Sequence, residues 1–186
     1  MRERADAPTD RGYRTTMGLF ATGVTVITVG DGRVRHGMTA SAVMSVSLRP
    51  PLLAVAVDTR AYTNQMIRRA GHFTVNVLAE GQEQVALRFA RAMAREAELF
   101  GPDPSPTGAT GDPLLPHTLA HLCCELASAY EEGDHILYVG RVTALWRADD
   151  PRPPLIFNRG RFCSTNCRVC ITRLDPTEAL CALIEG

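Results

Sequence analysis

Apolar residues along this chain fall into short runs of strand length. The run Val24–Val29 (VTVITV) is β-branched throughout, and the turn sequence Gly-Asp-Gly-Arg follows it, which is typical of a strand that enters a hairpin. Further strands are expected over Met38–Leu48, Leu52–Asp58, Phe73–Leu78, Leu119–Tyr130 and His135–Trp146. Pro50-Pro51 separates the first two of these, and an acidic turn joins the last two.

Helical spacing is confined to shorter stretches between these strands. Thr9 or Asp10 is a suitable cap for a helix that runs to Phe20. Further helices are expected over Tyr62–Ala70, over Gln82–Phe100 and after Asp175-Pro176. The pattern predicts a β-rich α+β fold, most simply an antiparallel barrel with a few peripheral helices.

Length and composition indicate one domain. A chain of 186 residues supports a single core, and we expect a flexible arm over 1–11, the domain over 12–162 and a Cys-rich tail with a short helix over 163–186. The formal net charge of zero argues against binding to nucleic acid or to an anionic membrane. No apolar run reaches the roughly 20 residues of a membrane span, and the polar N-terminus does not resemble a secretory signal. We therefore expect a cytoplasmic protein.

Several strings occur in an order that resembles a known family. They are FATGVTVIT (Phe20–Thr28), HGMTAS (His36–Ser41), SVSLRPPLLAVAVD (Ser45–Asp58), HFTVNVLAE (His72–Glu80), GDHILYVGRV (Gly133–Val142) and, more weakly, FNRGRF (Phe157–Phe162). Together they resemble the flavin reductases of two-component flavin-dependent monooxygenases, whose fold is the FMN-binding split β-barrel, a flavin reductase-like domain.

The resemblance implies an NAD(P)H:flavin oxidoreductase. Such an enzyme uses NADH or NADPH to reduce FMN or FAD and supplies the reduced flavin to a partner monooxygenase. It also implies a homodimer with the flavin near the subunit interface. Two alternatives stay open: a flavoprotein that retains its flavin and acts on another substrate, and a non-enzymatic binding partner that uses the barrel as a scaffold.

The segment after Gly37 suits the ring of a flavin. Small residues let the backbone approach a flat ring, and hydroxyl groups could donate to its pyrimidine edge, where negative charge develops on reduction. The residues expected there are Met38, Thr39, Ala40, Ser41 and Ala42. The alternative is a small-residue strand packed against a neighbouring element.

A second segment is expected to hold the flavin phosphate, because a helix N-terminus with a hydroxyl group is a ready anion site. The resemblance places Val57, Asp58, Thr59, Arg60 and Thr63 there, together with Arg88 and Phe89. Ala61 stands where the family usually has serine. Because all 20 basic residues are arginine, a protein cation on a phosphate must be an arginine, a histidine or the N-terminal amine. The alternative for both arginines is a solvated surface charge.

His135 is the candidate for catalysis on the nicotinamide side. Gly-Asp-His at the start of a long strand is a family feature, and the histidine could anchor the carboxamide or shuttle a proton. The alternative is a turn histidine bonded to Asp134. At the end of the domain, Arg159 and Phe162 match family positions, but Asn158 and Phe162 replace the usual histidine and tyrosine.

The tail departs from the family. Cys163, Cys167 and Cys170 are spaced closely enough to share one zinc ion or one iron–sulfur cluster. Redox-active thiols near the flavin and inert cysteines are the alternatives.

Overall fold

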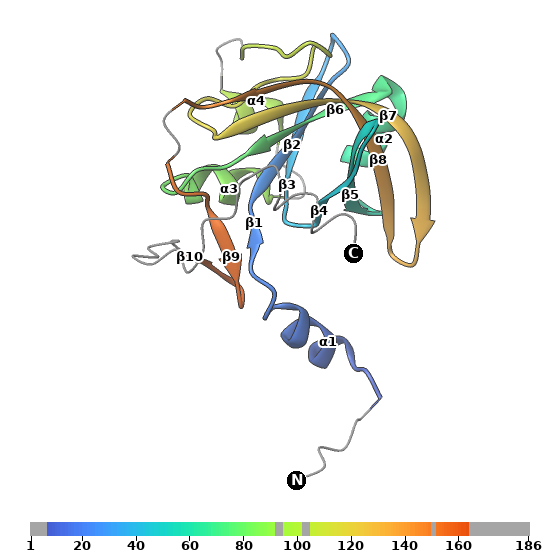
Figure 1. Cartoon of the computed structure of the whole chain (residues 1–186), viewed down its shortest axis with the longest axis vertical. Coiled ribbons are helices and arrows are strands. Elements are labelled where there is room, and N and C mark those ends of the chain that lie inside the picture. The colour runs from blue at the N-terminus through green and yellow to red at the C-terminus, as the bar shows by residue number, and fades with distance from the viewer. Residues whose placement is uncertain (1–6, 92–94, 102–104, 150–151, 164–186) are drawn as a thin grey trace.

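The main body of the protein is one curled antiparallel sheet (Figure 1). The structure is a computed structural model that describes residues 7–91, 95–101, 105–149 and 152–163. The sheet has seven strands in the order β3-β2-β6-β7-β8-β5-β4. Their bounds are β2 Thr25–Gly30, β3 Arg35–Ala40, β4 Val43–Leu48, β5 Pro51–Asp58, β6 His72–Val77, β7 Ala120–Glu132 and β8 His135–Arg147.

The connection between β3 and β4 makes the sheet a barrel. These strands are the two edges of the sheet, yet only Ser41 and Ala42 separate them in the chain. Two residues span too little distance to cross a flat seven-stranded sheet, so the edges must come together. The Ala56 N–H donates to the Ala42 carbonyl at 3.1 Å across this junction. The predicted split barrel is therefore confirmed, but the single strand expected over Met38–Leu48 is wrong, because the chain passes there from one edge to the other.

A small sheet and four helices surround the barrel in the described part of the chain. The sheet has the order β1-β9-β10, with β1 Thr22–Gly23, β9 Ile156–Asn158 and β10 Arg161–Cys163. The helices are α1 Asp10–Met17, α2 Thr63–Ala70, α3 Glu83–Phe89 and α4 Glu96–Phe100. The Thr9 side chain caps α1 by accepting from the Gly12 N–H at 3.1 Å, as expected, but the helix ends before the predicted Phe20.

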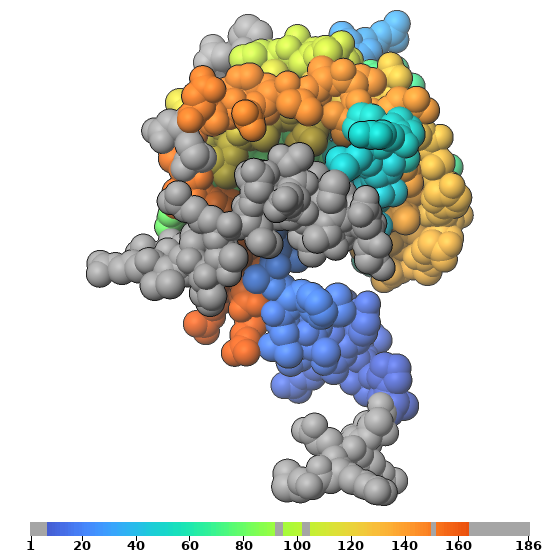
Figure 2. Space-filling view, in the orientation of Figure 1, coloured from blue at the N-terminus to red at the C-terminus, as the bar shows by residue number. Residues whose placement is uncertain are grey.

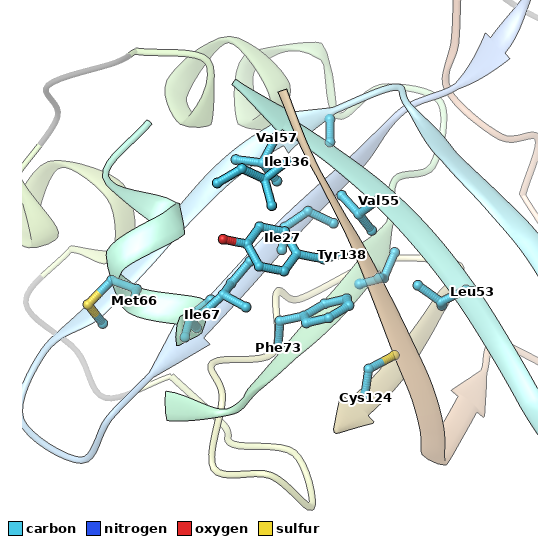
Figure 3. Close-up of a cluster of buried hydrophobic side chains, with 13 residues drawn as sticks. Ile27, Leu53, Val55, Val57, Met66, Ile67, Phe73, Cys124, Ile136 and Tyr138 are labelled. Carbon is cyan, nitrogen blue, oxygen red and sulfur yellow. The ribbon is translucent and has the colours of Figure 1, made fainter. Parts of the chain in front are cut away.

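Strand β2 is buried along its whole length because it serves two cores. Ile27 and Val29 face the barrel interior, where Figure 3 shows Tyr138 among Ile27, Ile67 and Phe73. Val26, on the other face, joins a second cluster with residues of α3 and α4. The unbroken apolar run of this strand therefore reflects burial on both of its faces.

The segment predicted as one helix over Gln82–Phe100 contains two helices, α3 and α4. In a continuous helix, Phe89 and Phe100 would be about 16 Å apart along the axis, at 1.5 Å per residue. Their ring centroids are 5.3 Å apart in an edge-to-face contact. The chain folds back so that both rings enter the second core, and this burial overrides the helical pattern.

Candidate functional site

A groove of about 720 Å³ opens between β3, the start of α2 and the end of α3. This volume lies within the range typical of small-molecule and cofactor sites. Its lining includes His36, Gly37, Met38, Thr39, Asp58, Arg60, Ala61, Tyr62, Thr63, Gln65, Phe89, Ala90 and Arg91. The fold thus brings together, in one groove, the segments that the sequence predicted for the flavin ring and for its phosphate.

The first turn of α2 has unused hydrogen-bonding groups. Thr63 is fully buried in the groove wall, and its hydroxyl oxygen has no hydrogen-bond partner among the described residues. Tyr62, the N-cap residue, makes no side-chain capping bond. Within the described part of the chain, the backbone N–H groups of Tyr62 and Thr63 also have no acceptor. Unpaired donors at a helix N-terminus fit an anion such as a phosphate.

Arg60 and Asp58 form an ion pair beside this turn. The Arg60 Nη2 to Asp58 Oδ2 distance is 2.8 Å, and the Arg60 Nε to Asp58 Oδ1 distance is 3.0 Å. Hydrogen bonds from the Arg60 side chain and backbone N–H hold the pKa of the Asp58 carboxyl well below its usual value. Asp58 therefore stays ionised and partly neutralises Arg60, whose side chain is 88% exposed. Arg60 is positioned at the mouth of the groove, where an incoming phosphate would compete with Asp58.

Strand β3 meets α3 in close contact. A Cβ on Gly37 would lie 2.8 Å from the Phe89 ring, so the absence of a side chain serves this packing. The Thr39 hydroxyl donates to the Ala86 carbonyl at 2.6 Å, which leaves it able to accept, but not to donate, toward a ligand. The expected donor role of Thr39 is therefore wrong, because α3 uses its proton.

The rest of the predicted ring segment leaves the groove. Ala40 is buried in the barrel core, and Ser41 and Ala42 form the exposed link between β3 and β4. Neither of these two link residues lines the groove.

Other predicted cofactor residues also lie outside the groove. Val57 is fully buried in the barrel core, and the Thr59 N–H donates to the Asp134 carbonyl at 2.9 Å. Arg88 is exposed, with Nη1 3.5 Å from the Leu99 carbonyl oxygen. Arg88 and Thr59 could reach a ligand only by changing conformation.

The end of the domain lies apart from the main groove. Phe162 packs against Phe157 with ring centroids 5.6 Å apart at the edge of the second core. Arg159 lines a second groove of about 510 Å³ together with residues of α1 and the following turn, including Arg14 and Gly18. The predicted roles of Phe162 and Arg159 in cofactor binding stay predictions.

His135 lies near the main groove at the first position of β8. In the strand register it is paired with Asp58 of β5, which lines the groove. Its Nδ1 is 2.7 Å from the Asp134 Oδ1, and this hydrogen bond lowers the pKa of Asp134. The bond to Asp134 is the one that the structural alternative expected. Because the imidazole is 45% exposed, the ring is also accessible to a ligand.

Three groove residues were absent from the sequence prediction. His36 and Tyr62 touch with ring centroids 5.1 Å apart, and Arg91 follows α3. Burial lowers the pKa of His36, so its imidazole is neutral near pH 7. Their positions, two residues before Met38, next to Thr63 and two residues after Phe89, were the only available signal.

The predicted metal site lies mostly outside the described residues. Cys163 is exposed on β10, whereas Cys167, Cys170 and the predicted C-terminal helix belong to the part of the chain that the structure does not describe. Within the described ranges, no group of three His, Cys, Asp or Glu side chains is placed to hold a metal ion. The same ranges contain no helix long and apolar enough to cross a membrane.

Comparison with known proteins identifies the family. Residues 17–166 match the family described as "Flavin reductase like domain". This chain belongs to that family. It is 43% identical over 152 residues to an NADH-dependent flavin reductase from a Rhodococcus species, covering 80% of this chain and 82% of the relative. It is 37% identical over 158 residues to HsaB, the reductase subunit of a flavin-dependent monooxygenase from Rhodococcus jostii RHA1, covering 85% and 79%.

A solved structure agrees with the family assignment. BorF, the flavin reductase component of a bacterial two-component tryptophan halogenase, superposes with a TM-score of 0.78 at 40% identity and covers 84% of this chain and 98% of its own. The family, the barrel and the order of the sequence strings therefore agree.

Proposed function

We propose that this flavin reductase family member uses NADH, or alternatively NADPH, to reduce FMN or FAD, and supplies the reduced flavin to a partner monooxygenase. The observation that carries the proposal is the groove beside α2, where the buried Thr63 hydroxyl and two backbone N–H groups have no partner among the described residues. These donors fit the phosphate that both flavins share. The named relatives favour the reductase over a flavoprotein that retains its flavin.

The chain's own residues would chiefly bind and orient. A bound flavin supplies the hydride-accepting chemistry, and transfer from a nicotinamide requires close stacking of the two rings. The α2 N-terminus and Thr63 would hold the phosphate, while the β3 segment at Met38 and Thr39 would lie along the ring. His135, next to Asp58 across β5 and β8, would orient the nicotinamide or hold a proton at its free ring nitrogen.

The decisive experiment is anaerobic stopped-flow absorbance. Purified protein with FMN or FAD is mixed first with NADH and then with NADPH. Rapid bleaching near 450 nm, with repeated turnover of added flavin, is the expected result and identifies the preferred nucleotide. Tightly bound flavin that neither nucleotide bleaches would overturn the reductase and favour the retained-flavin alternative.

A homodimer is the proposed assembly, and α1 supports it. Tyr13, Met17 and Phe20, spaced to share one face, are 62%, 44% and 66% exposed, and α1 itself buries no residue. The helix projects from the barrel body (Figure 2). It is nevertheless held in place, because the Asn158 side-chain amide and the Arg159 N–H both donate to the Gly18 carbonyl. A fixed helix with an uncovered apolar face fits a second copy of the chain.

The cytoplasmic location and the zinc or iron–sulfur site at Cys163, Cys167 and Cys170 stay predictions. Protein purified without oxygen and analysed for both metals tests the latter: stoichiometric zinc or iron is the result that the metal version requires, and its absence leaves the thiol alternatives.

A further inference from the structure

One end of the main groove is formed by an aromatic pair that the flavin ring and phosphate do not require. The rings of His36 and Tyr62 meet edge to face, at 84° and 5.1 Å between centroids. His36 is buried, whereas Tyr62 lines the groove and is 43% exposed. The buried imidazole thus fixes the position of a tyrosine ring that remains accessible to a ligand.

The position of this pair relative to the phosphate site matters. Tyr62 directly precedes Thr63, whose unpartnered hydroxyl marks the phosphate position in the proposed function. His36 lies about 10 Å along β3 from Thr39, at roughly 3.3 Å per residue, in the direction away from Ser41. The pair therefore lies on the phosphate side of the groove, away from the segment expected to contact the flavin ring.

Chemistry distinguishes the two flavins at this point. FMN ends at its phosphate, whereas FAD continues through a second phosphate and a ribose to adenine. An adenine base has a flat face that stacks on an accessible aromatic side chain.

Charge in the groove also favours a longer anion. Arg60 is paired with Asp58, but no carboxylate of the described residues pairs with Arg91, which lines the same groove at the end of α3. A second phosphate next to the first could be contacted by this additional guanidinium.

We propose that Tyr62, held by His36 and with Arg91 in the same groove, forms an adenylate subsite that makes FAD the preferred flavin of this protein. The inference rests on the proposed function, because it takes the position of the first phosphate from it.

The test compares flavin dissociation constants without any nicotinamide nucleotide. Flavin fluorescence titrations with FAD and with FMN are made on the wild type, Tyr62→Ala and Tyr62→Phe. Tyr130→Ala is the matched control, because Tyr130 is 53% exposed on β7 and does not line the groove.

The wild type is expected to bind FAD at least about fivefold more tightly than FMN, the scale of one base–aromatic stack. Tyr62→Ala should raise the FAD constant by a similar factor and change the FMN constant by less than about twofold. Tyr62→Phe and Tyr130→Ala should retain the preference for FAD, because both keep a ring at position 62.

Other outcomes separate the two proposals. If neither flavin binds to the wild type, the proposed function itself fails. If both flavins bind but Tyr62→Ala weakens both equally or neither, the adenylate subsite is overturned while the reductase stands. A Tyr62→Ala variant that changes only the KM for NADH would place the nucleotide's adenine there instead and would also overturn the inference.

Discussion

At the scale of single residues, Thr63 is unusual because a buried hydroxyl without a partner costs about 1–3 kcal/mol of folding free energy. Thr63→Val keeps the shape and removes that hydroxyl. We expect the free energy of unfolding without ligand to stay constant or to rise, and flavin binding to weaken by about 1.5–3 kcal/mol, the scale of a hydrogen bond to a charged group. Urea unfolding and flavin titration measure the two effects.

Thr28→Val is the matched control for Thr63. Thr28 is also fully buried, but its hydroxyl donates to the Pro113 carbonyl at 2.6 Å and accepts from the Asn76 amide at 2.9 Å. This variant should lose about 1–3 kcal/mol of stability and keep the flavin affinity of the folded protein. If Thr63→Val behaved in the same way, its hydroxyl would be structural.

Two arginines compete for the phosphate. If the family assignment of Arg88 is right, Arg88→Ala should weaken flavin binding by about 1.5–3 kcal/mol, measured by titration. In the structure, however, Arg91 lines the groove, whereas Arg88 lies toward the Leu99 carbonyl. An unchanged dissociation constant for Arg88→Ala, with a loss for Arg91→Ala, would transfer the role to Arg91.

His135 can be tested by separating binding from turnover. For His135→Ala we expect kcat/KM for NAD(P)H oxidation to fall by a larger factor than flavin affinity, because the imidazole is proposed to orient the nicotinamide. Steady-state kinetics and flavin titration of the same preparation give both numbers. His117→Ala, which changes an exposed histidine outside the groove, should alter neither. A greater loss of flavin binding than of turnover would make His135 structural.

At the scale of elements, the contact between β3 and α3 shapes the groove wall. A Cβ on Gly37 would lie within 2.9 Å of two Phe89 ring carbons and 3.1 Å from the Ile27 carbonyl oxygen. Gly37→Ala should therefore cost about 1–3 kcal/mol in urea unfolding, the usual range for overpacking, and should weaken flavin binding by displacing α3.

Gly23→Ala provides the comparison for Gly37, since nothing lies within 4 Å of a Cβ added in β1. Equal stability of the two variants would mean that α3 tolerates the added methyl group without strain.

At the scale of the whole molecule, α1 decides the proposed assembly. Light scattering should give twice the 20.2 kDa chain mass at micromolar concentration. Met17→Asp places a charge on the uncovered apolar face and should shift the protein toward monomers, because burying an unpaired carboxylate is costly. Thr15→Asp makes the same charge on the helix side that lines the second groove and should leave the mass unchanged. A wild type that is monomeric throughout would contradict the homodimer.

Much of the architecture was predictable because its signals are local. β-branched runs, proline breaks and turn sequences located most strands and α2, and the order of the motifs predicted a flavin reductase, which the family match and the named relatives confirm. Where prediction was wrong, a distant contact overrode the local pattern. The stretch over Met38–Leu48 divides because the barrel closes at Ser41 and Ala42, and Gln82–Phe100 breaks because Phe89 and Phe100 pack together.

The polar loop after α4 shows the same limit. Glycine and proline predict an irregular segment, but Asp112 within it is fully buried. Its carboxylate accepts hydrogen bonds from the Gly30 N–H at 2.9 Å and from the Thr74 hydroxyl at 3.0 Å. Composition alone does not reveal that this loop is fixed to the barrel.

The sequence by itself determined the family, the β-rich barrel and which segments meet a flavin, because each of these depends on residue order and local periodicity. Only the tertiary structure decided which side chains share the groove. It directed the Thr39 hydroxyl to α3, left the Thr63 hydroxyl unpartnered, and brought His36, Tyr62 and Arg91 together from three separate segments. Such neighbours are set by the closure of the sheet and the packing of α2 and α3 on it, and neither leaves a periodic trace in the sequence.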